Sequence, residues 1–348
     1  MIDFKVQRYA LLALASAGLF GAAAPALKPI AGDLHPVLLA GLLYLGSFLG
    51  LGIARAVRGR SRSEAALNAR DLPPLVGAIV AGGLAAPVLL VWGLSGLAAS
   101  AASLLLAAEG VLTMLLAALL FREAIASRIW LAAALTLFAA GLLAWSPGAG
   151  VPISLHAVAI LGACLLWGID NNLTSRIALA DPVAIAMWKG LVAGVTNTGI
   201  GLVLAPAVLG GGWLVALGVG AVGYGASLVL YVLALRHLGA GRTAAHFGTA
   251  PFFGAVLAVA FLGEPVTATF AAAFALTAAG TWLALSERHL HEHEHEAMEH
   301  EHRHVHDEHH QHAHLGDEGP EPHSHAHRHA PLRHRHAHFP DLHHRHPH

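Results

Sequence analysis

The sequence predicts an all-α polytopic membrane protein: ten transmembrane helices in two inverted five-helix repeats, followed by a disordered C-terminal tail. Three observations predict this fold class, namely an apolar composition, long stretches without ionisable side chains, and an internal repeat. Of the 348 residues, 56% are hydrophobic and only 12% are charged. That composition excludes an ordinary soluble domain.

The longest apolar stretches cannot be single helices. No ionisable side chain lies between Asp71 and Glu109, and one helix of that length would extend roughly 55 Å, against a hydrocarbon core of about 30 Å. We therefore expect the chain to turn back at residues 92–96, and at the three glycines 210–212 within the stretch 190–235. The sequence does not alternate between apolar and polar residues, and helices satisfy every backbone group in lipid.

Ten helices account for the apolar segments. They are expected at residues 9–27, 36–54, 74–93, 98–121 and 129–145, and then at 156–174, 182–204, 213–235, 244–262 and 267–285. The first of them, which follows Lys5 and Arg8, is expected to act as its own insertion signal. Cys164 is the only cysteine, so no intrachain disulfide can form.

Basic residues predict the orientation. They gather in alternate connections, after the second, fourth, sixth and eighth helices, as Arg55, Arg58, Arg60, Arg62, Arg70, Arg122, Arg128, Arg176, Arg236 and Arg242. Among the intervening connections, Lys28 is the exception. The positive-inside rule then predicts a multi-pass protein of the cytoplasmic (inner, plasma) membrane with both termini in the cytoplasm.

The two halves of the chain repeat each other. Residues 19–21 (Leu-Phe-Gly) match 166–168 (Leu-Trp-Gly), residues 35–37 match 181–183, and the segment that ends at Glu123 matches the one that ends at Glu264. The offsets are 147, 146 and 141 residues. Because each copy holds an odd number of helices, the second copy must be inverted, an arrangement common in secondary transporters with a site near the midplane.

The same residues carry a family resemblance. The aromatic-Gly pair early in each half, together with Glu123 and Glu264, makes residues 9–285 similar to the drug/metabolite transporter superfamily, in particular its EamA-type members. The resemblance implies ten helices and transport of small metabolites without ATP. We expect EamA-like repeats at 1–147 and 148–288 and a tail at 289–348. The chain departs from the family pattern in the first half, where Glu109-Gly110 stands in place of the Pro retained in Ala250-Pro251.

Glu109 lies about halfway through an apolar helix, where a carboxylate is most costly. As a functional residue, it would bind a cation or take up a proton. The alternative is a protonated Glu that bonds a neighbouring helix and has no part in transport.

A second polar group surrounds Asp170 and Lys189, which fall at similar depths of consecutive helices. A buried ion pair is expected there, with Asn171 and Asn172 satisfying the remaining donors and acceptors. Such a pair is either part of a substrate path or a structural clamp between the two helices.

The remaining candidates are aromatic or isolated. His246 is either a ligand or a hydrogen-bonded residue at a helix end, and the aromatic side chains line a cavity or pack in the membrane. The full set of expected substrate-pathway residues is Glu109, Trp167, Asp170, Asn171, Asn172, Trp188, Lys189, Tyr224 and His246.

Residues 289–348 differ in character from the rest. They include 23 histidines mixed with Glu, Asp and Arg, and they lack the apolar residues of a core, so we expect no folded structure there. Neutral imidazoles at this density bind Zn, Ni, Co or Cu; the alternative is a solvated tail with incidental metal binding. The expected metal ligands are His291, His293, His295, His300, His302, His304, His306, His309, His310, His312 and His314.

Three functions remain to be compared. The first is a secondary transporter, in the direction of export, for a small polar metabolite, with a metal-binding tail and no required cofactor. The second is a transporter of a divalent transition metal. The third, an intramembrane hydrolase, lacks its motifs, and the chain has no P-loop either. The expected partners are the lipid bilayer and a small-molecule or metal-ion substrate, not nucleic acid; the oligomeric state is open, a homodimer being one alternative.

Overall fold

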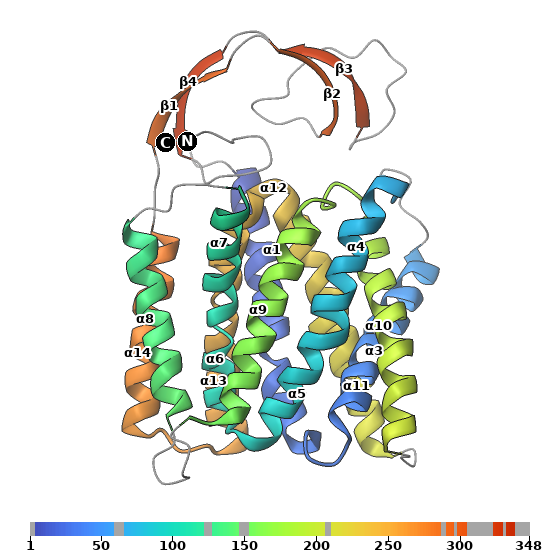
Figure 1. Cartoon of the computed structure of the whole chain (residues 1–348), viewed down its shortest axis with the longest axis vertical. Coiled ribbons are helices and arrows are strands. Elements are labelled where there is room, and N and C mark those ends of the chain that lie inside the picture. The colour runs from blue at the N-terminus through green and yellow to red at the C-terminus, as the bar shows by residue number, and fades with distance from the viewer. Residues whose placement is uncertain are drawn as a thin grey trace.

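The structure, a computed structural model, describes residues 4–58, 66–121, 127–145, 153–205, 210–286 and four short strands beyond them. The helices run side by side in one bundle (Figure 1). Nine segments of the described chain are long and apolar enough to cross a membrane, and α8 is a shorter apolar helix alongside them. The expected ten helices are therefore present in a multi-pass membrane protein.

The first half contains α1 (Phe4–Gly21), α2 (Ala23–Leu27), α3 (Pro36–Arg58), α4 (Leu72–Ala78), α5 (Ala86–Gly96), α6 (Ala99–Leu105), α7 (Ala108–Phe121) and α8 (Ser127–Ala144). The second half contains α9 (Leu155–Ser175), α10 (Pro182–Leu204), α11 (Gly211–Val219), α12 (Ser227–Phe247), α13 (Ala250–Leu262) and α14 (Ala268–Leu285). Two π-helices, η3 (Ile79–Ala85) and η4 (Gly220–Ala226), join α4 to α5 and α11 to α12. Short 3₁₀ turns lie at η1 (Lys28–Ile30) and η2 (Ala69–Asp71).

The helices pack as an inverted repeat requires. α3 packs on its counterpart α10, α8 on α14, and α6 on α13, while α1 packs on α12 and α5 on α9. The repeat relates the last two pairs to each other, because exchanging the two halves converts the pair α1–α12 into the pair α9–α5. Glu123, one of the residues that revealed the repeat, lies outside the described residues.

One turn differs from the sequence expectation. Residues 92–96 belong to α5, and the chain turns after Gly96, where Leu97 is extended. The two glycines allow close contact with α9, because a Cβ at Gly93 would collide with Ile160 and one at Gly96 with His156. Lys28, the exception in the charge pattern, donates hydrogen bonds to the Leu94 and Leu97 carbonyls, at 2.9 and 2.5 Å, at the end of α5.

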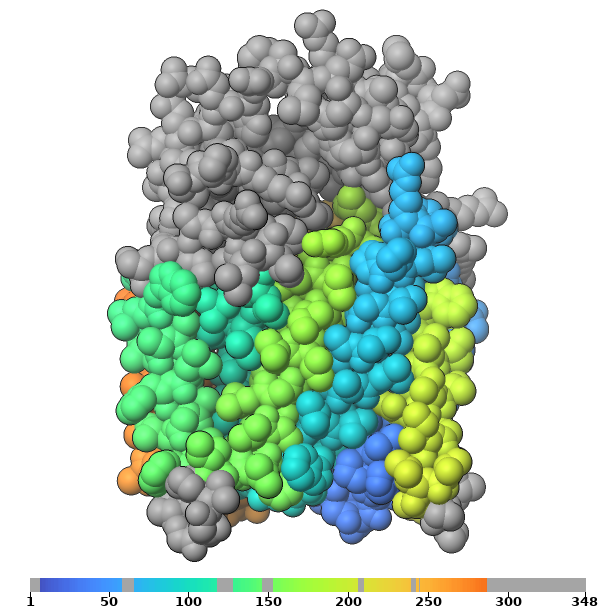
Figure 2. Space-filling view, in the orientation of Figure 1, coloured from blue at the N-terminus to red at the C-terminus, as the bar shows by residue number. Residues whose placement is uncertain are grey.

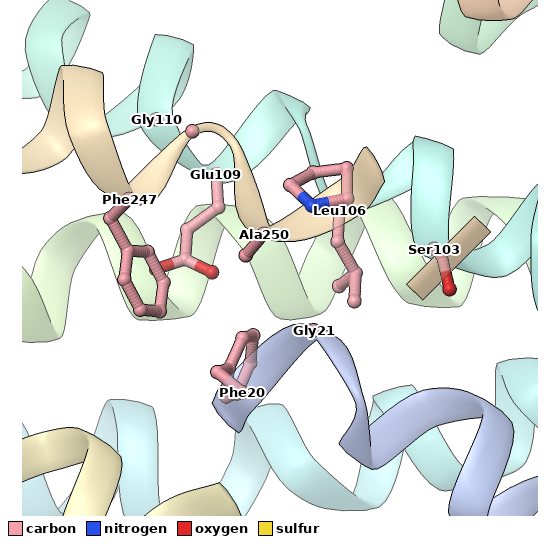
Figure 3. Close-up of a pocket in the computed structure, with 10 residues that line it drawn as sticks. Phe20, Gly21, Ser103, Leu106, Glu109, Gly110, Phe247 and Ala250 are labelled. Atoms are coloured by element: carbon pink, nitrogen blue, oxygen red, sulfur yellow. The ribbon is translucent and has the colours of Figure 1, made fainter. Parts of the chain in front are cut away.

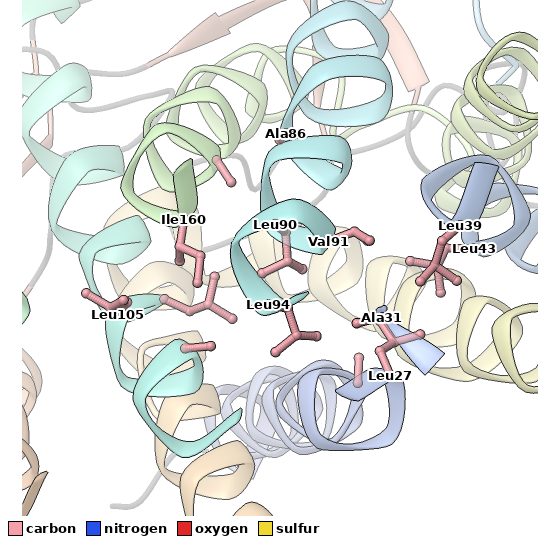
Figure 4. Close-up of a cluster of buried hydrophobic side chains, with 14 of the residues drawn as sticks. Leu27, Ala31, Leu39, Leu43, Ala86, Leu90, Val91, Leu94, Leu105 and Ile160 are labelled. Carbon is pink, nitrogen blue, oxygen red and sulfur yellow. The ribbon is translucent and has the colours of Figure 1, made fainter. Parts of the chain in front are cut away.

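Arg55 is near the end of α3, Arg70 is in η2 just before α4, and Arg176 follows α9. Arg236 donates to the Ala178 and Ala180 carbonyls in the turn after α9. We call this end of the bundle, where α3 ends and α4 begins, the basic end (top of Figure 1). Toward the opposite end, large aliphatic side chains pack into a core. Leu27, Leu39, Leu94, Leu105 and Ile160 meet there from five different helices (Figure 4).

The outer surface is apolar as well. In Figure 2, α8, α9, α4–α5 and α10 lie next to each other on one face of the bundle. Large apolar side chains on these helices are exposed, including Trp130, Phe138, Val158 and Val195. A band of this kind fits contact with lipid rather than water.

Four strands follow the bundle: β1 (Leu290–His295), β2 (Met298–His304), β3 (His323–His329) and β4 (Leu332–Ala337). β1 pairs antiparallel with β4 and β2 with β3, and the register sets histidines opposite each other, as in His291 with His336 and His302 with His325. These strands differ from the absence of folded structure expected for 289–348. Their sequences alternate His with Glu, Arg, Ser or Ala. That alternation matches the period of a strand, although a two-stranded sheet is marginally stable alone.

Candidate functional site

A cavity of about 60 Å³ lies in the bundle, between the two repeats. This volume has room for a few water molecules. Its walls come from α1, α3, α7, α9, α10, η4 and α12, and they consist of Phe20, Tyr44, Ser47, Glu109, Trp167, Asp170, Asn171, Lys189, Gly223, Tyr224, Ser227, Leu228, Tyr231 and Phe247.

Aromatic rings form much of the wall. Phe20 makes edge-to-face contacts with Trp167 and Tyr224, at centroid distances of 5.6 and 5.7 Å, and Tyr44 contacts Tyr224 at 5.6 Å. Phe247 joins Phe20 at 5.3 Å. Phe20 and Trp167 are the aromatic members of the two repeated aromatic-Gly pairs. The axis that relates the two repeats therefore passes close to the contact between Phe20 and Trp167, at the cavity wall.

Lys189 and Asp170 form a buried ion pair. The ammonium nitrogen lies 2.6 and 2.7 Å from the two carboxylate oxygens, and the Thr174 hydroxyl donates to Asp170 Oδ1 at 2.9 Å. A Cβ at Gly82 would collide with this carboxylate, so the backbone of η3 approaches it only because residue 82 is glycine. The pair holds α9 and α10 together beside η3.

Glu109 also contributes to the wall, from the second position of α7. The side chain is 7% exposed, and its Oε1 accepts a hydrogen bond from Asn171 Nδ2 at 3.0 Å. The same amide also donates to the Thr113 hydroxyl at 3.3 Å. No Lys, Arg or His of the described chain forms an ion pair with Glu109.

One π-helix supports the cavity wall and the other forms part of it. A π-helix shifts the hydrogen-bond pattern of its turn, and such segments are frequent at functional sites. In η3, the Gly82 carbonyl accepts hydrogen bonds from the Tyr44 hydroxyl at 2.6 Å and from Trp167 Nε1 at 3.1 Å. The equivalent π-helix η4 contributes Gly223 and Tyr224. The buried hydroxyl of Tyr224 has no hydrogen-bond partner among the described residues.

Two helices are interrupted at nearly equivalent positions. α6 ends at Leu105 and α7 begins at Ala108, whereas α12 ends at Phe247 and α13 begins at Ala250. A pocket of about 10 Å³, enough for about one water molecule, lies where these interruptions meet. Figure 3 shows the side chains of Glu109, Phe20 and Phe247 around it. Glu109 thus borders both this pocket and the larger cavity.

Six of the nine residues expected from the sequence line the cavity: Glu109, Trp167, Asp170, Asn171, Lys189 and Tyr224. The other three do not. Asn172 donates to the Thr113 and Gly168 carbonyls, at 3.0 and 2.8 Å. Trp188 is 51% exposed, on the outer surface. His246 Nδ1 lies 2.7 Å from the Arg242 carbonyl, as the helix-end alternative describes.

The polar contacts differ from the expectation in one respect. Asn171 and Asn172 were expected to complete the Asp170–Lys189 pair. Asn171 instead reaches Glu109, while Thr174 serves the pair. The reason is helix geometry, because Thr174 is four residues after Asp170 and lies on the same face of α9, unlike the next two residues.

Sequence reasoning missed several wall residues, chiefly Phe20, Tyr44, Ser47 and Phe247. Phe20 had a signal, since it stands at the repeat position of Trp167. Tyr44 and Phe247 lie in apolar helices without a motif, and only packing brings them to the cavity.

The proposed metal ligands lie beyond the bundle. His291, His293 and His295 are on β1, and His300, His302 and His304 are on β2. His306, His309, His310, His312 and His314 lie outside the described residues.

Comparison with known proteins assigns the family. The model of the EamA-like transporter family matches residues 7–145 and 154–286, one match in each half. The chain belongs to the EamA-like transporter family. A protein from Methanothermobacter thermautotrophicus, named an uncharacterized transporter, is 27% identical over 271 residues, which cover 71% of this chain and 77% of that protein.

The fold is also known from experiment. One crystal structure matches with a TM-score of 0.61 and 19% identity, covering 80% of this chain and 96% of the other. That identity supports the fold alone. Together with the apolar helices, the family makes this EamA-like protein a multi-pass membrane transporter.

Proposed function

We propose that the protein is a secondary transporter that exports a small polar metabolite, and that Glu109 lies on the substrate path. The observation that carries this proposal is a buried carboxylate that has no cationic partner among the described residues and lies in a cavity between two inverted repeats. Interrupted helices at corresponding positions of two repeats are the arrangement in which such transporters hold their substrate.

The proposed path uses the cavity wall. Glu109, Trp167, Asp170, Asn171, Lys189 and Tyr224 remain in it, and Phe20, Tyr44 and Phe247 join them. Asn172, Trp188 and His246 are excluded, since they do not line the cavity. Asp170 and Lys189 neutralise each other, so we assign this pair a structural role in the cavity wall. We assign Glu109 to binding the substrate or a proton.

The proposed orientation places the basic end in the cytoplasm, in accordance with the positive-inside rule. The N-terminal end of α1 and the C-terminal end of α14 are at this basic end (Figure 1). Both termini would then be cytoplasmic, and the histidine-rich tail would follow α14 at the cytoplasmic mouth.

For the tail, we propose binding of Zn, Ni, Co or Cu. The backbone register pairs His291 with His336 and His302 with His325. The 23 histidines of residues 289–348 supply imidazole ligands at high density. Transition metals prefer such nitrogen ligands.

The alternative function is transport of the metal itself, which the tail's composition favours. Against it, no group of three or more His, Cys, Asp or Glu side chains capable of holding a metal occurs in the part of the bundle that the structure describes. A metal path through the bundle would need such ligands. We therefore place metal binding in the tail and not on the path.

A resistance screen tests the proposed function. Cells that overexpress the protein would be challenged with toxic analogues of amino acids and other small metabolites, and separately with Zn, Ni, Co and Cu. We expect resistance to an organic compound that is lost in Glu109→Gln and kept in Asp33→Asn, which removes an exposed carboxylate that does not line the cavity. Resistance to metals alone would contradict the proposal and favour metal transport.

A further inference from the structure

The charges in the cavity do not balance. Lys189 is bound by both oxygens of Asp170, so this pair contributes no net charge. Glu109 has only a neutral amide as its described partner. A buried carboxylate is stable when it is protonated or when a cation lies beside it. The cavity therefore favours a positively charged occupant.

The rings in the wall favour the same kind of occupant. Tyr44 and Trp167 direct their polar atoms to the Gly82 carbonyl, so what remains available to a ligand is ring surface. Phe20 and Phe247 have no polar side-chain atoms at all. Aromatic faces attract organic cations, and several rings around one ammonium group form a recurrent binding site for it.

Other occupants fit less well. An anion would need a free cation, and Lys189, the only Lys or Arg among the described wall residues, is already paired. A sugar would need many hydrogen-bonding groups, yet Ser227 donates to the Ser16 carbonyl at 3.0 Å and Asn171 to Glu109. The free hydroxyl of Tyr224 leaves one polar group for a substituent on the ligand.

We propose that Glu109 and the surrounding rings form a binding site for a small organic cation, so that the exported metabolite carries an ammonium group. This inference rests on the proposed transport function and narrows its substrate. Glu109 supplies the counter-charge, while Phe20, Trp167 and Phe247 supply ring surface.

Binding to the purified full-length protein tests the site. The ligands would be alkylammonium ions of increasing size, up to tetramethylammonium and choline. Each would be compared with its neutral isostere, in which carbon replaces nitrogen. We expect cations to bind and isosteres of the same shape not to bind. Equal affinity for the two members of a pair would overturn the assignment, because shape alone would then explain binding.

Variants locate the site. We expect Glu109→Gln to weaken binding of the preferred cation by at least about 10-fold, since it removes the charge but keeps the shape. Trp167→Leu should weaken binding by about 5-fold, whereas Trp188→Leu, on the outer surface, should leave it unchanged. Unchanged binding in folded Glu109→Gln protein would overturn the proposal.

Transport assays separate this inference from the proposed function. If proteoliposomes carry a neutral or anionic metabolite while no ammonium ion binds, the protein is a metabolite exporter and the cation site is wrong. If ammonium ions bind at Glu109 but no organic compound is carried, the site is right and the export function is wrong.

Discussion

The carboxylates of Glu109 and Asp170 border one cavity but have different partners. Asp170 accepts from Lys189 and Thr174, so its charge is matched within the protein. Glu109 has only the Asn171 amide among its described partners, and its charge is unmatched. Because removing a partner from a buried ion pair is costly, Asp170 is suited to a constant structural role. Glu109 is suited to bind and release a cation or a proton.

The ion pair makes a prediction about stability. Asp170→Ala and Lys189→Ala should each destabilise the fold by roughly 3–5 kcal/mol, because each leaves one buried charge alone. The double variant should be less destabilised than the sum of the two. Thermal unfolding of purified protein, followed by size-exclusion chromatography, measures this. Strictly additive losses would mean that the two side chains do not interact.

At the scale of single residues, the sequence predicted the buried ionisable side chains but not the side chains that pack against them. Glu109, Asp170 and Lys189 were predictable because ionisable residues are rare in apolar helices. The polar partners were harder to assign, since Asn171 and Asn172 project from different faces of α9. The roles of Tyr44 and Phe247 depend on neighbours far away in the chain, which no local pattern encodes.

Among the helices, α3 and α10 show how glycine permits close packing. A Cβ at Gly201 would collide with the backbone of Leu38, and one at Gly194 with Leu45 on the same partner helix. In membranes, small residues let helices approach until their backbones make van der Waals contact. The glycines of α10 therefore allow it to approach α3 closely.

Two glycines of α10 form a matched pair for testing the interface. Gly201→Ala should push α3 and α10 apart and lower stability by about 1–3 kcal/mol, the usual cost of overpacking. Gly199→Ala should be neutral or slightly stabilising, because nothing lies within 4 Å of its added Cβ and alanine favours helix. Thermal unfolding of the two variants compares them. Equal effects would show that the interface is not close-packed at Gly201.

Helix existence was easier to predict than helix irregularity. Apolar segments fixed the positions of the helices, but the π-helices η3 and η4 left no trace that differs from an ordinary glycine-rich helix. Their starts, Ile79 and Gly220, are 141 residues apart, the offset that separates Glu123 from Glu264. Once the structure shows one of these π-helices, the repeat offset therefore predicts the position of the other. The glycines of residues 92–96 were misassigned to a turn because glycine both breaks helices and permits close packing.

Over the whole molecule, the inverted repeat determines where the site lies. Each half alone leaves a helix face exposed, and pairing the halves brings Phe20 against Trp167 and the interruption in α6–α7 against that in α12–α13. The repeat, the helix count and the family could be predicted from the sequence. The domain boundaries at 147 and 288 remain predictions.

The bundle predicts the topology of reporter fusions. A reporter fused after Arg58 or after Ser286 should be cytoplasmic, and one fused after Trp145 should be outside, because Trp145 follows α8 at the end opposite to the basic end. Activity of alkaline phosphatase and fluorescence of a cytoplasmic reporter measure the two locations. A cytoplasmic signal after Trp145 would contradict the orientation and the helix count.

The tail makes a separate prediction. Truncation after Ser286 should leave the helical bundle folded, because the described packing of the ten helices is complete without it. Zn or Ni bound per purified protein, measured by equilibrium dialysis, should fall to near zero in the truncated form. Export of the metabolite should continue. Metal binding at full stoichiometry after truncation would place the ligands in the bundle instead.

The most direct test of the central claim is transport by Glu109→Gln in proteoliposomes. The variant keeps the size and hydrogen bonding of the side chain but cannot carry a negative charge. We predict normal insertion and thermal stability with at least about 10-fold slower transport of the compound found in the resistance screen, while Asp33→Asn transports at the wild-type rate. Wild-type transport by Glu109→Gln would contradict the claim that the substrate path runs through this carboxylate.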